Sequence, residues 1–348
     1  MSQPVAMASD PRRILIIKPS SLGDVVHALP VLPLLRRRYP KAHIAWLVAP
    51  YCAGLIEGRG DLDRVILFDR RYLGKAWFNP AAMASLWRLD QDLRRGHFDL
   101  VLDLQGLFRS GWLAWRTGAR MRVGFANGRE MAPLFYTHKV RIETDQIHAV
   151  DRYLRLAAAV GCESRPVEFS FPSSEEDRQS VRRLLGESGP YAVLLPGANW
   201  ETKRWPAERF AELVRPLSAR FGLRSIVAGG EDVKELARQI DGALDLSGKT
   251  NLRELVCLLK DAEVVVGNDS GPAHIAAGLG RPLVALFGPT DPVRTGPYGR
   301  PECVVQCHES CLGCRRRRCE HMRCLKKMHI EPVLRAIDRQ LGRAPGAR

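Results

Sequence analysis

Residues 14–30 read ILIIKPSSLGDVVHALP, and this stretch decides the fold class. Four consecutive apolar residues, 14–17, have the length and composition of a buried strand. A short polar loop with Ser20, Ser21 and Asp24 follows, and the apolar residues from Val25 onward begin a helix. A strand, a polar loop and a helix in immediate succession are typical of a βαβ unit, whose loop lies at the carboxyl end of a parallel strand.

The same succession recurs along the chain. Further strands are predicted at residues 43–48, 64–68, 98–102, 191–195, 225–228, 263–266 and 283–287. Helices are predicted at residues 80–95, 107–116, 206–221, 232–240, 252–260 and 272–279. A turn-rich segment near residue 170 separates two halves, and a length of 348 residues suits two domains. We therefore expect an α/β protein with two doubly wound parallel-sheet domains, residues 1–172 and 173–325, then a C-terminal helix and tail, residues 326–348.

Composition and charge narrow the class of protein. The hydrophobic fraction of 45% and charged fraction of 26% are ordinary for a globular chain. The first residues, MSQPVAMASDPRR, lack the apolar core of a signal peptide, and no run approaches the ~20 apolar residues of a membrane span, so we expect a cytoplasmic protein. The net charge of +15 includes arginine clusters at 36–38, 70–71 and 315–318. These are either solvated helix faces or a surface that attracts polyanions.

Two familiar nucleotide-binding signatures are absent. No G-x-G-x-x-G follows the first strand, and GALDLSGKT, residues 242–250, has five residues between its glycines where a P-loop has four. A dinucleotide-dependent dehydrogenase and a P-loop NTPase are therefore both disfavoured.

An anion site is predicted at VVVGNDSGPAHIAAGLG, residues 264–280. After the strand, Asp269 lies in the turn, Ser270 suits the N-cap, Gly271 permits close approach to the backbone, and Pro272 suits the first helical turn. Free N–H groups and the helix dipole favour a phosphate there. A well-capped structural helix is the alternative.

The neighbouring strand ends carry matching chemistry. LLPGANWETKRWPAERF, residues 194–210, places Lys203 in a polar loop after a strand, and AGGEDVKE, residues 228–235, places Glu231 after another. A cation can pair with phosphates, and an acid can bind a ribose diol or an adenine amino group. Together these loops predict a nucleotide-diphosphate site, although Glu231 alone is equally well explained as a helix-starting acid.

Several segments resemble one known family. KPSSLGDVVHALP, DLQGLFRSG, GREMAPLFYTHK, PGANWETKRWP and GNDSGPAHIAAGLGRPLVALFGPTDP are similar to the ADP-heptose:lipopolysaccharide heptosyltransferases, glycosyltransferase family 9, over about residues 12–300. GREMAPLFY and DRRYLGKAWF are most similar to the heptosyltransferase I branch. Where that branch has hydroxyl residues near the donor phosphates, this chain has Ala198 and Asn199.

The resemblance implies a GT-B fold, with two Rossmann-like domains facing across a cleft, the acceptor site on the first and the nucleotide-sugar site on the second. It also implies inverting, metal-independent transfer of heptose from ADP-heptose to the Kdo region of a lipid A precursor. A glycosyltransferase of the same family that uses a different nucleotide sugar or acceptor is the alternative. The enzyme would need no cofactor. Its partners would be the donor and a lipid-linked anionic saccharide at the inner face of the cytoplasmic membrane, and no nucleic acid.

The resemblance also assigns residues. It implies that Asp24 is the general base. The donor-binding positions that it implies are Lys203, Glu231, Asp269, Ser270, Gly271 and His274. The acceptor-binding positions that it implies are Ser20, Ser21, Arg70, Arg71, Lys75 and Arg129. The residues alone leave a second interpretation of Asp24, because Ser21 and Asp24 form an S-x-x-D capping box, with Gly23 allowing an unusual turn.

The tail CVVQCHESCLGCRRRRCEHMRC, residues 303–324, holds six of the nine cysteines. Cys311, Cys314, Cys319 and Cys324 are candidate ligands of a structural zinc, with Cys303, Cys307, His308 and His321 as rival ligands. Free or redox-sensitive thiols and disulfides are the alternatives. The adjacent arginines raise a second class of function, a nucleic-acid-binding protein with a metal knuckle, which the strand ends do not support because they lack interleaved aromatic residues.

Overall fold

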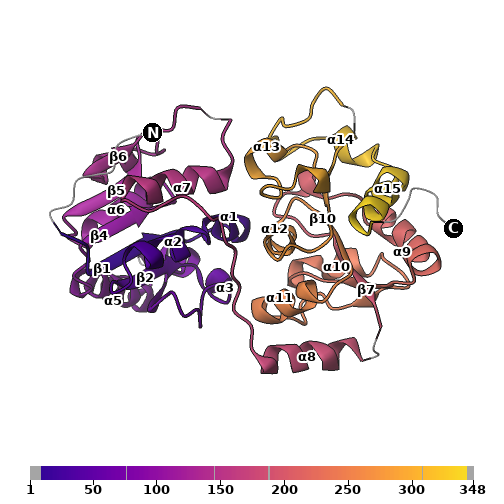
Figure 1. Cartoon of the computed structure of the whole chain (residues 1–348), viewed down its shortest axis with the longest axis horizontal. Helices are drawn as coiled ribbons and strands as arrows, with labels where there is room; N and C mark the ends of the chain where they lie inside the picture. The colour runs from indigo at the N-terminus through magenta and orange to yellow at the C-terminus, as the bar shows by residue number, and fades with distance from the viewer. Residues whose placement is uncertain (1–8, 76, 145, 187–188, 308, 343–348) are drawn as a thin grey trace. The chain divides into compact units, whose positions relative to one another are not determined.

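The computed structural model describes residues 9–75, 77–144, 146–186, 189–307 and 309–342. The chain divides into two compact units at the bond between Pro172 and Ser173. Each unit is a parallel sheet covered by helices (Figure 1).

The first unit contains a six-stranded parallel sheet with the order β3-β2-β1-β4-β5-β6. Its strands are β1 (Arg13–Ile17), β2 (His43–Val48), β3 (Arg64–Leu67), β4 (Leu100–Asp103), β5 (Met121–Phe125) and β6 (His138–Val140). Its helices are α1 (Leu22–Ala28), α2 (Val31–Arg38), α3 (Pro50–Ala53), α4 (Arg70–Leu73), α5 (Pro80–Arg95), α6 (Phe108–Arg116), the 3₁₀ helix η1 (Ala132–Phe135) and α7 (Ala149–Ala159).

The second unit repeats this topology with the order β12-β11-β10-β7-β8-β9. Its strands are β7 (Tyr191–Leu195), β8 (Arg224–Val227), β9 (Leu244–Asp245), β10 (Val264–Asn268), β11 (Leu283–Leu286) and β12 (Val304–Val305). Its helices are α8 (Glu175–Leu185), η2 (Glu201–Lys203), α9 (Ala207–Phe221), η3 (Glu231–Val233), α10 (Lys234–Ala237), α11 (Leu252–Lys260), α12 (Gly271–Gly278), α13 (Pro292–Thr295), η4 (Pro301–Cys303), α14 (Arg323–Lys326) and α15 (Ile330–Gln340).

The central strands explain why the apolar runs are continuous. Ile14 to Ile17 are fully buried, because β1 has a strand on each side and helices over both faces. In register, Ile16 lies opposite Trp46 of β2 and Leu102 of β4. In the second unit, Val266 of β10 lies opposite Leu194 of β7 and Val284 of β11. These pairs confirm the expectation of doubly wound parallel sheets.

Some elements differ from those expected. The helix predicted at residues 232–240 is a 3₁₀ turn, η3, followed by one turn of α-helix, α10. The short strands β5, β6, β9 and β12 were not among the predicted strands. The C-terminal helix α15 buries Val333, Ala336 and Ile337 in the core of the second unit. Within the described part of the chain, no helix has both the length and the apolar character needed to cross a bilayer.

Both sheets have a topological switch point, where successive connections leave in opposite directions. It lies between β1 and β4 in the first unit and between β7 and β10 in the second. Ligands of open α/β sheets bind outside the carboxyl ends of the strands at such points. The loops after these four strands are therefore the first places to look for a site.

Candidate active site

The switch point of the second unit brings three loops together. β10 pairs in parallel with β7 on one side and with β11 on the other, so the loops after these three strands lie next to one another at the carboxyl end of the sheet. They carry Lys203, Asp269 and Thr290, and α12 begins in the middle of them with His274 in its first turn. Sequence reasoning had predicted all of these residues except Thr290.

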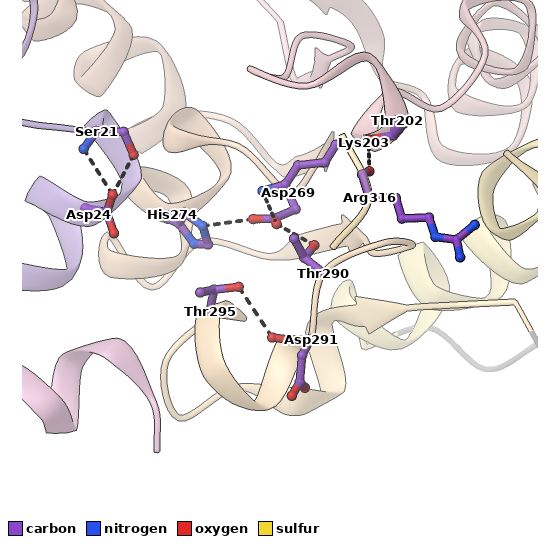
Figure 2. Close-up of polar contacts among 10 residues, drawn as sticks. All are labelled: Ser21, Asp24, Thr202, Lys203, Asp269, His274, Thr290, Asp291, Thr295 and Arg316. Atoms are coloured by element: carbon purple, nitrogen blue, oxygen red, sulfur yellow. Dashed lines mark hydrogen bonds and ion pairs between the residues drawn. The ribbon is translucent and has the colours of Figure 1, made fainter. Parts of the chain in front are cut away.

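Asp269 is the centre of this cluster (Figure 2). Its Oδ2 accepts hydrogen bonds from Lys203 Nζ at 2.7 Å and from Thr290 Oγ1 at 2.6 Å. Its Oδ1 lies 3.2 Å from His274 Nε2. An ionised carboxylate only accepts hydrogen bonds, so the proton of this contact belongs to Nε2 of His274. We call Lys203, Asp269, His274 and Thr290 the Asp269 cluster.

Three members of the cluster, Asp269, His274 and Thr290, are buried, and Lys203 is partly exposed. Burial by itself raises the pKa of Asp269, but the hydrogen bond from His274 and the positive charge of Lys203 outweigh it, and the pKa is held well below its usual range. Asp269 is therefore an anion at neutral pH, and it fixes the ammonium group of Lys203 beside the start of α12.

The loop that carries Lys203 is tied down by Asn268 at the end of β10. The Asn268 side chain accepts a hydrogen bond from the Trp205 backbone N–H at 3.0 Å and donates one to the Pro196 carbonyl at 2.8 Å. Trp205 is buried, and its indole N–H donates to the Met328 carbonyl at 2.9 Å. Both ends of the loop are therefore anchored to the same side chain. The sequence had suggested a turn at Asn268 and Asp269 and no anchoring role for Asn268, which is the last residue of β10.

The start of α12 differs in one detail from the expectation. Ser270 occupies the N-cap with extended backbone, as predicted, but its hydroxyl makes no capping hydrogen bond. Ser270 Oγ is buried and has no hydrogen-bond partner among the described residues. Gly271 begins the helix, and the first N–H groups of a helix lack partners within it. The helix start therefore offers unmatched polar groups beside Lys203.

Glu231 lies on the next loop along the edge, after β8. It starts η3, and its carboxylate pairs with Lys234 at 2.6 Å instead of joining the Asp269 cluster. Gly248, in the segment first compared with a P-loop, makes room for this side chain. A Cβ built on Gly248 would lie 2.5 Å from Glu231 Oε1.

Trp200 belongs to the site although sequence analysis had given it no role. The Lys203 ammonium lies 4.7 Å from the centre of its ring, and the Arg317 guanidinium lies 4.8 Å from the same centre. Thr202 Oγ1 also donates to the Arg316 carbonyl at 2.8 Å (Figure 2). The arginine-rich tail thus packs against the loop that carries Lys203. In the sequence, only the W-x-x-K spacing of Trp200 and Lys203 could have indicated the contact between them.

At the switch point of the first unit, Asp24 lies in the first turn of α1. The Ser21 N–H and Oγ both donate to Asp24 Oδ2, at 3.0 and 2.8 Å (Figure 2). Gly23 lies in the same helical turn and does not have a positive φ. The prediction of an unusual backbone conformation at Gly23 was therefore wrong. The helical conformation that α1 requires at Gly23 is open to any residue.

Lys18 is a buried cation beside this carboxylate that sequence analysis had not assigned. Burial lowers the pKa of Lys18, but the neighbouring Tyr153, Asp24 and Asp103 outweigh it and the pKa is raised. The Lys18 ammonium lies 5.0 Å from the centre of the Tyr153 ring. Lys18 is therefore charged, whereas burial raises the pKa of the neighbouring Asp103.

The predicted acceptor-binding residues lie on both sides of β1 in the strand order. Arg70 and Arg71 are on α4 and Lys75 is just after it, next to β3, and all three are exposed. Arg129 is on the loop after β5, where its N–H donates to the Gly106 carbonyl at 2.9 Å. Ser20 and Ser21 lie between these groups, on the loop after β1.

The cysteine-rich tail lies along the loop that carries Thr290. The N–H groups of Gly313 and Arg315 donate to the carbonyls of Gly288 and Pro289, at 3.1 and 2.7 Å. Burial raises the pKa of Cys324 to about 11, while N–H groups of Met322 and His321 lower that of Cys319. The tail is therefore hydrogen-bonded to the loop that follows β11, at the carboxyl ends of the strands.

The described part of the tail does not bring a set of candidate metal ligands together. All nine cysteines are described and are free thiols, so none forms a disulfide. Among the described residues, no group of three or more His, Cys, Asp or Glu side chains is arranged to hold a metal ion, and His308 lies outside those residues. The zinc at Cys311, Cys314, Cys319 and Cys324 stays a prediction.

Comparison with known proteins agrees with this architecture. Residues 86–325 match glycosyltransferase family 9 (heptosyltransferase). The chain belongs to this family. It is 33% identical over 300 residues to lipopolysaccharide heptosyltransferase 1 of Salmonella typhimurium, which covers 83% of this chain and 92% of that protein.

Solved structures of family members give the same result. E. coli heptosyltransferase WaaC with ADP matches with a TM-score of 0.76 and 29% identity, over 94% of this chain and 99% of that chain. E. coli ADP-heptose lps heptosyltransferase II matches in fold with a TM-score of 0.74 and 24% identity, over 94% of this chain and 98% of that chain. The expected GT-B fold class is therefore confirmed, and this heptosyltransferase-family chain is a glycosyltransferase. The nucleic-acid-binding alternative is not favoured.

Proposed function

We propose that this chain transfers a heptose from ADP-heptose to a Kdo sugar of a lipid A precursor, as a step in the synthesis of the lipopolysaccharide inner core. The observation that carries the proposal is the Asp269 cluster, in which Asp269 holds the ammonium of Lys203 beside the start of α12. An ammonium group and the N–H groups of a helix start are well suited to a diphosphate. The structural likeness to WaaC with ADP supports ADP as the nucleotide.

The contacts support the proposed donor-side roles. An ammonium has three N–H donors, and Asp269 takes one from Lys203, so the others face the diphosphate. The buried hydroxyl of Ser270 and the backbone at Gly271 supply further donors there. His274 acts indirectly, by holding Asp269. Glu231, one loop away, recognises the ribose or the adenine.

Asp24 is the general base in this proposal. Its carboxylate takes the proton from the acceptor hydroxyl as the hydroxyl oxygen forms its bond to the anomeric carbon. The bond from that carbon to the phosphate oxygen breaks at the same time, and the electron pair leaves with ADP from the opposite face. The configuration at the anomeric carbon is therefore inverted. A positioned base is worth ~10²–10⁴-fold in rate.

The acceptor is a lipid-linked anionic saccharide. Its carboxylates and phosphates are bound by hydroxyl and basic side chains, because a guanidinium group can form two parallel hydrogen bonds with either kind of anion. These side chains are Ser20, Ser21, Arg70, Arg71, Lys75 and Arg129. The enzyme works in the cytoplasm, in peripheral contact with the inner membrane surface, and takes no nucleic acid as partner. Catalysis uses no metal and no cofactor, and the tail zinc is a separate structural prediction.

A transfer assay tests the proposal. The purified chain is incubated with a Kdo-bearing lipid A precursor and ADP-heptose, UDP-sugar or GDP-sugar donors, and the product is weighed by mass spectrometry. We expect a mass increase of one heptose only with ADP-heptose, and calorimetric binding of ADP ahead of UDP and GDP. Transfer from a UDP- or GDP-sugar alone, or retention on random DNA without any effect of ADP, would overturn it.

A further inference from the structure

The helix α5 exposes large apolar side chains at its N-terminal end. Trp77 and Phe78, just before the helix, are 92% and 75% exposed, and Met83 and Trp87, one turn apart within it, are 48% and 61% exposed. The opposite face of α5 buries Ala82, Leu89 and Leu93 against the first unit. Surface apolar residues are ordinary when they are scattered singly, but a group of this size marks an interaction surface.

This group lies at the edge of the sheet that carries Asp24. The connection from β3 through α4 to α5 leaves the carboxyl end of a parallel strand, and so does the loop after β1. Three more exposed apolar residues lie at this edge, at the start of α6 and in or next to η1: Phe108, Met131 and Leu134. Phe108 packs edge-on against Phe135, which joins these two elements. The apolar residues therefore gather at one end of the unit.

Cations accompany the apolar residues. Arg70, Arg71, Lys75 and Arg88 are exposed, and none of them forms an ion pair within the described part of the chain. Three nearby carboxylates are engaged elsewhere: Asp69 caps α4, Asp90 pairs with Arg94 and Arg116, and Asp92 pairs with Arg64. A fourth, the exposed Glu130, lies near Arg109.

One of these cations, Arg70, also lies near a fifth cation, Arg109. Burial and the nearby charge of Arg70 lower the pKa of Arg109, in the first turn of α6. An anionic partner relieves that repulsion.

We propose that this surface, Trp77, Phe78, Met83 and Trp87 with the surrounding cations, docks on an anionic lipid bilayer. The inference rests on the proposed function, whose acceptor is lipid-linked, and it names the face that meets the membrane. Tryptophan favours the interface between headgroups and acyl chains, and basic residues are attracted to anionic headgroups. Stable peripheral binding takes two signals, and here an apolar insertion and a basic patch lie together.

Vesicle sedimentation tests the surface. The full chain is mixed with phosphatidylglycerol vesicles or phosphatidylcholine vesicles, at low and high salt. We expect binding to the anionic vesicles that weakens with salt. The double variant W77S/F78S should bind about tenfold more weakly or worse, because partitioning scales with the apolar area inserted. R88E should weaken binding at low salt and have less effect at high salt.

Trp115 provides a matched control. It is 49% exposed, like the proposed docking residues, but it lies at the C-terminal end of α6, one residue before that helix ends. W115S should bind the vesicles within about twofold of the unmodified chain. Melting temperatures of all variants check folding, and the single variants W87S and R88E serve if the double variant does not fold.

The inference is overturned by no binding of the unmodified chain to anionic vesicles, by unchanged binding of W77S/F78S, or by an equal loss in W115S. A change from dimer to monomer in W77S/F78S with vesicle binding intact also overturns it, because the face is then a self-association surface. An assay of heptose transfer to a deacylated, soluble acceptor distinguishes failure of the membrane-docking proposal from failure of the proposed function. W77S/F78S should keep that rate, whereas failure of the unmodified chain in that assay counts against the proposed function alone.

Discussion

Two Ser-x-x-Asp segments in this chain build the same local structure. Ser21 donates to Asp24 Oδ2 from its N–H and Oγ, at 3.0 and 2.8 Å, at the start of α1. Ser174 donates to Asp177 Oδ2 in the same way, at 2.7 Å for both bonds, at the start of α8. Both are capping arrangements that satisfy groups at a helix start.

The surroundings of the two carboxylates differ. Asp177 forms an ion pair with Arg253 at 2.9 Å. Its helix, α8, begins just after the junction between the two units and does not directly follow a β-strand. Asp24 follows the central strand β1 at the switch point, beside the buried cation Lys18. The same four-residue pattern therefore marks a helix start in both places. Asp24 alone follows a strand at the switch point, and this position is the reason that we propose a chemical role for Asp24 and none for Asp177.

The largest expected effect is on turnover, and it separates the two aspartates. Asp24→Asn should lower the rate of heptose transfer by ~10²–10⁴-fold, the contribution of a general base, with ADP affinity unchanged. Asp177→Asn removes an equivalent cap and should leave turnover close to that of the unmodified chain. Steady-state kinetics and ADP calorimetry on both variants measure this. If Asp24→Asn keeps more than about a tenth of the rate, Asp24 is a cap and the base lies elsewhere.

The second effect extends the comparison to lysines. Lys203→Ala should weaken ADP binding by roughly 1.5–3 kcal/mol, the value of a hydrogen bond to a charged group, or about 10- to 150-fold in Kd. Lys260→Ala, an exposed lysine that ends α11, should leave Kd unchanged. Calorimetric titration with ADP measures both. Equal affinity of the Lys203 variant and the unmodified chain would remove Lys203 from the donor site.

The third effect concerns stability and pH at Asp177. Burial raises the pKa of Asp177, but hydrogen bonds from Ser174 and Arg253 outweigh it, so the folded-state pKa is lowered. A lowered carboxylate pKa stabilises the fold above the unfolded value of ~3.9 and loses that contribution as pH falls toward the folded value. Asp177→Asn should therefore cost about 1–2 kcal/mol of unfolding free energy at pH 7.

That difference should shrink as the pH falls below about 4. Urea unfolding at pH 7, 5, 4 and 3 follows it. A difference that stays constant over this range contradicts the assignment of the stabilisation to the ionised carboxylate. Asp24→Asn at pH 7 provides the comparison, with an expected loss of about 1 kcal/mol for the cap alone.

The smallest expected effect is that of metal removal from the tail. If Cys311, Cys314, Cys319 and Cys324 hold zinc, the purified chain contains about one zinc per molecule and a chelator lowers its Tm. The shift should be small, because Cys324 and Leu325 are already buried in the core of the second unit. The buried Cys257 of α11 is the control, since Cys257→Ala should leave the zinc content unchanged. Metal-free protein with full stability would identify the cluster as thiols.

Elements with strong local patterns were predictable from the amino-acid sequence. The strand at residues 43–48 and the helices at residues 80–95 and 252–260 have the predicted bounds, because a continuous apolar run or a 3.6-residue period is a local property. The Rossmann-like halves followed from the alternation of these patterns. Strand ends also share one edge in any parallel sheet, so the meeting of Lys203, Asp269 and His274 was predictable.

The weakly patterned strands could not be predicted from local sequence, because they depend on contacts with distant residues. β5 contains Arg122 and Gly124, and a Cβ on that glycine would lie 2.3 Å from the Tyr136 ring. Gly124 is required here because the ring of Tyr136, twelve positions later in the chain, occupies the space of a side chain. A local hydrophobic pattern therefore could not predict this strand. β9 and β12 are two residues long and exist through pairing with a neighbouring strand.

The partners within the site were likewise decided by the tertiary structure. Thr290 reaches Asp269 because β11 pairs with β10, and Arg317 reaches the Trp200 ring although 117 positions separate them in the chain. A hydrogen bond or ring contact depends on which strands are neighbours and on how the tail returns across their ends. Strand order is set by packing of the whole unit, and the periodicity of single segments carries no record of it.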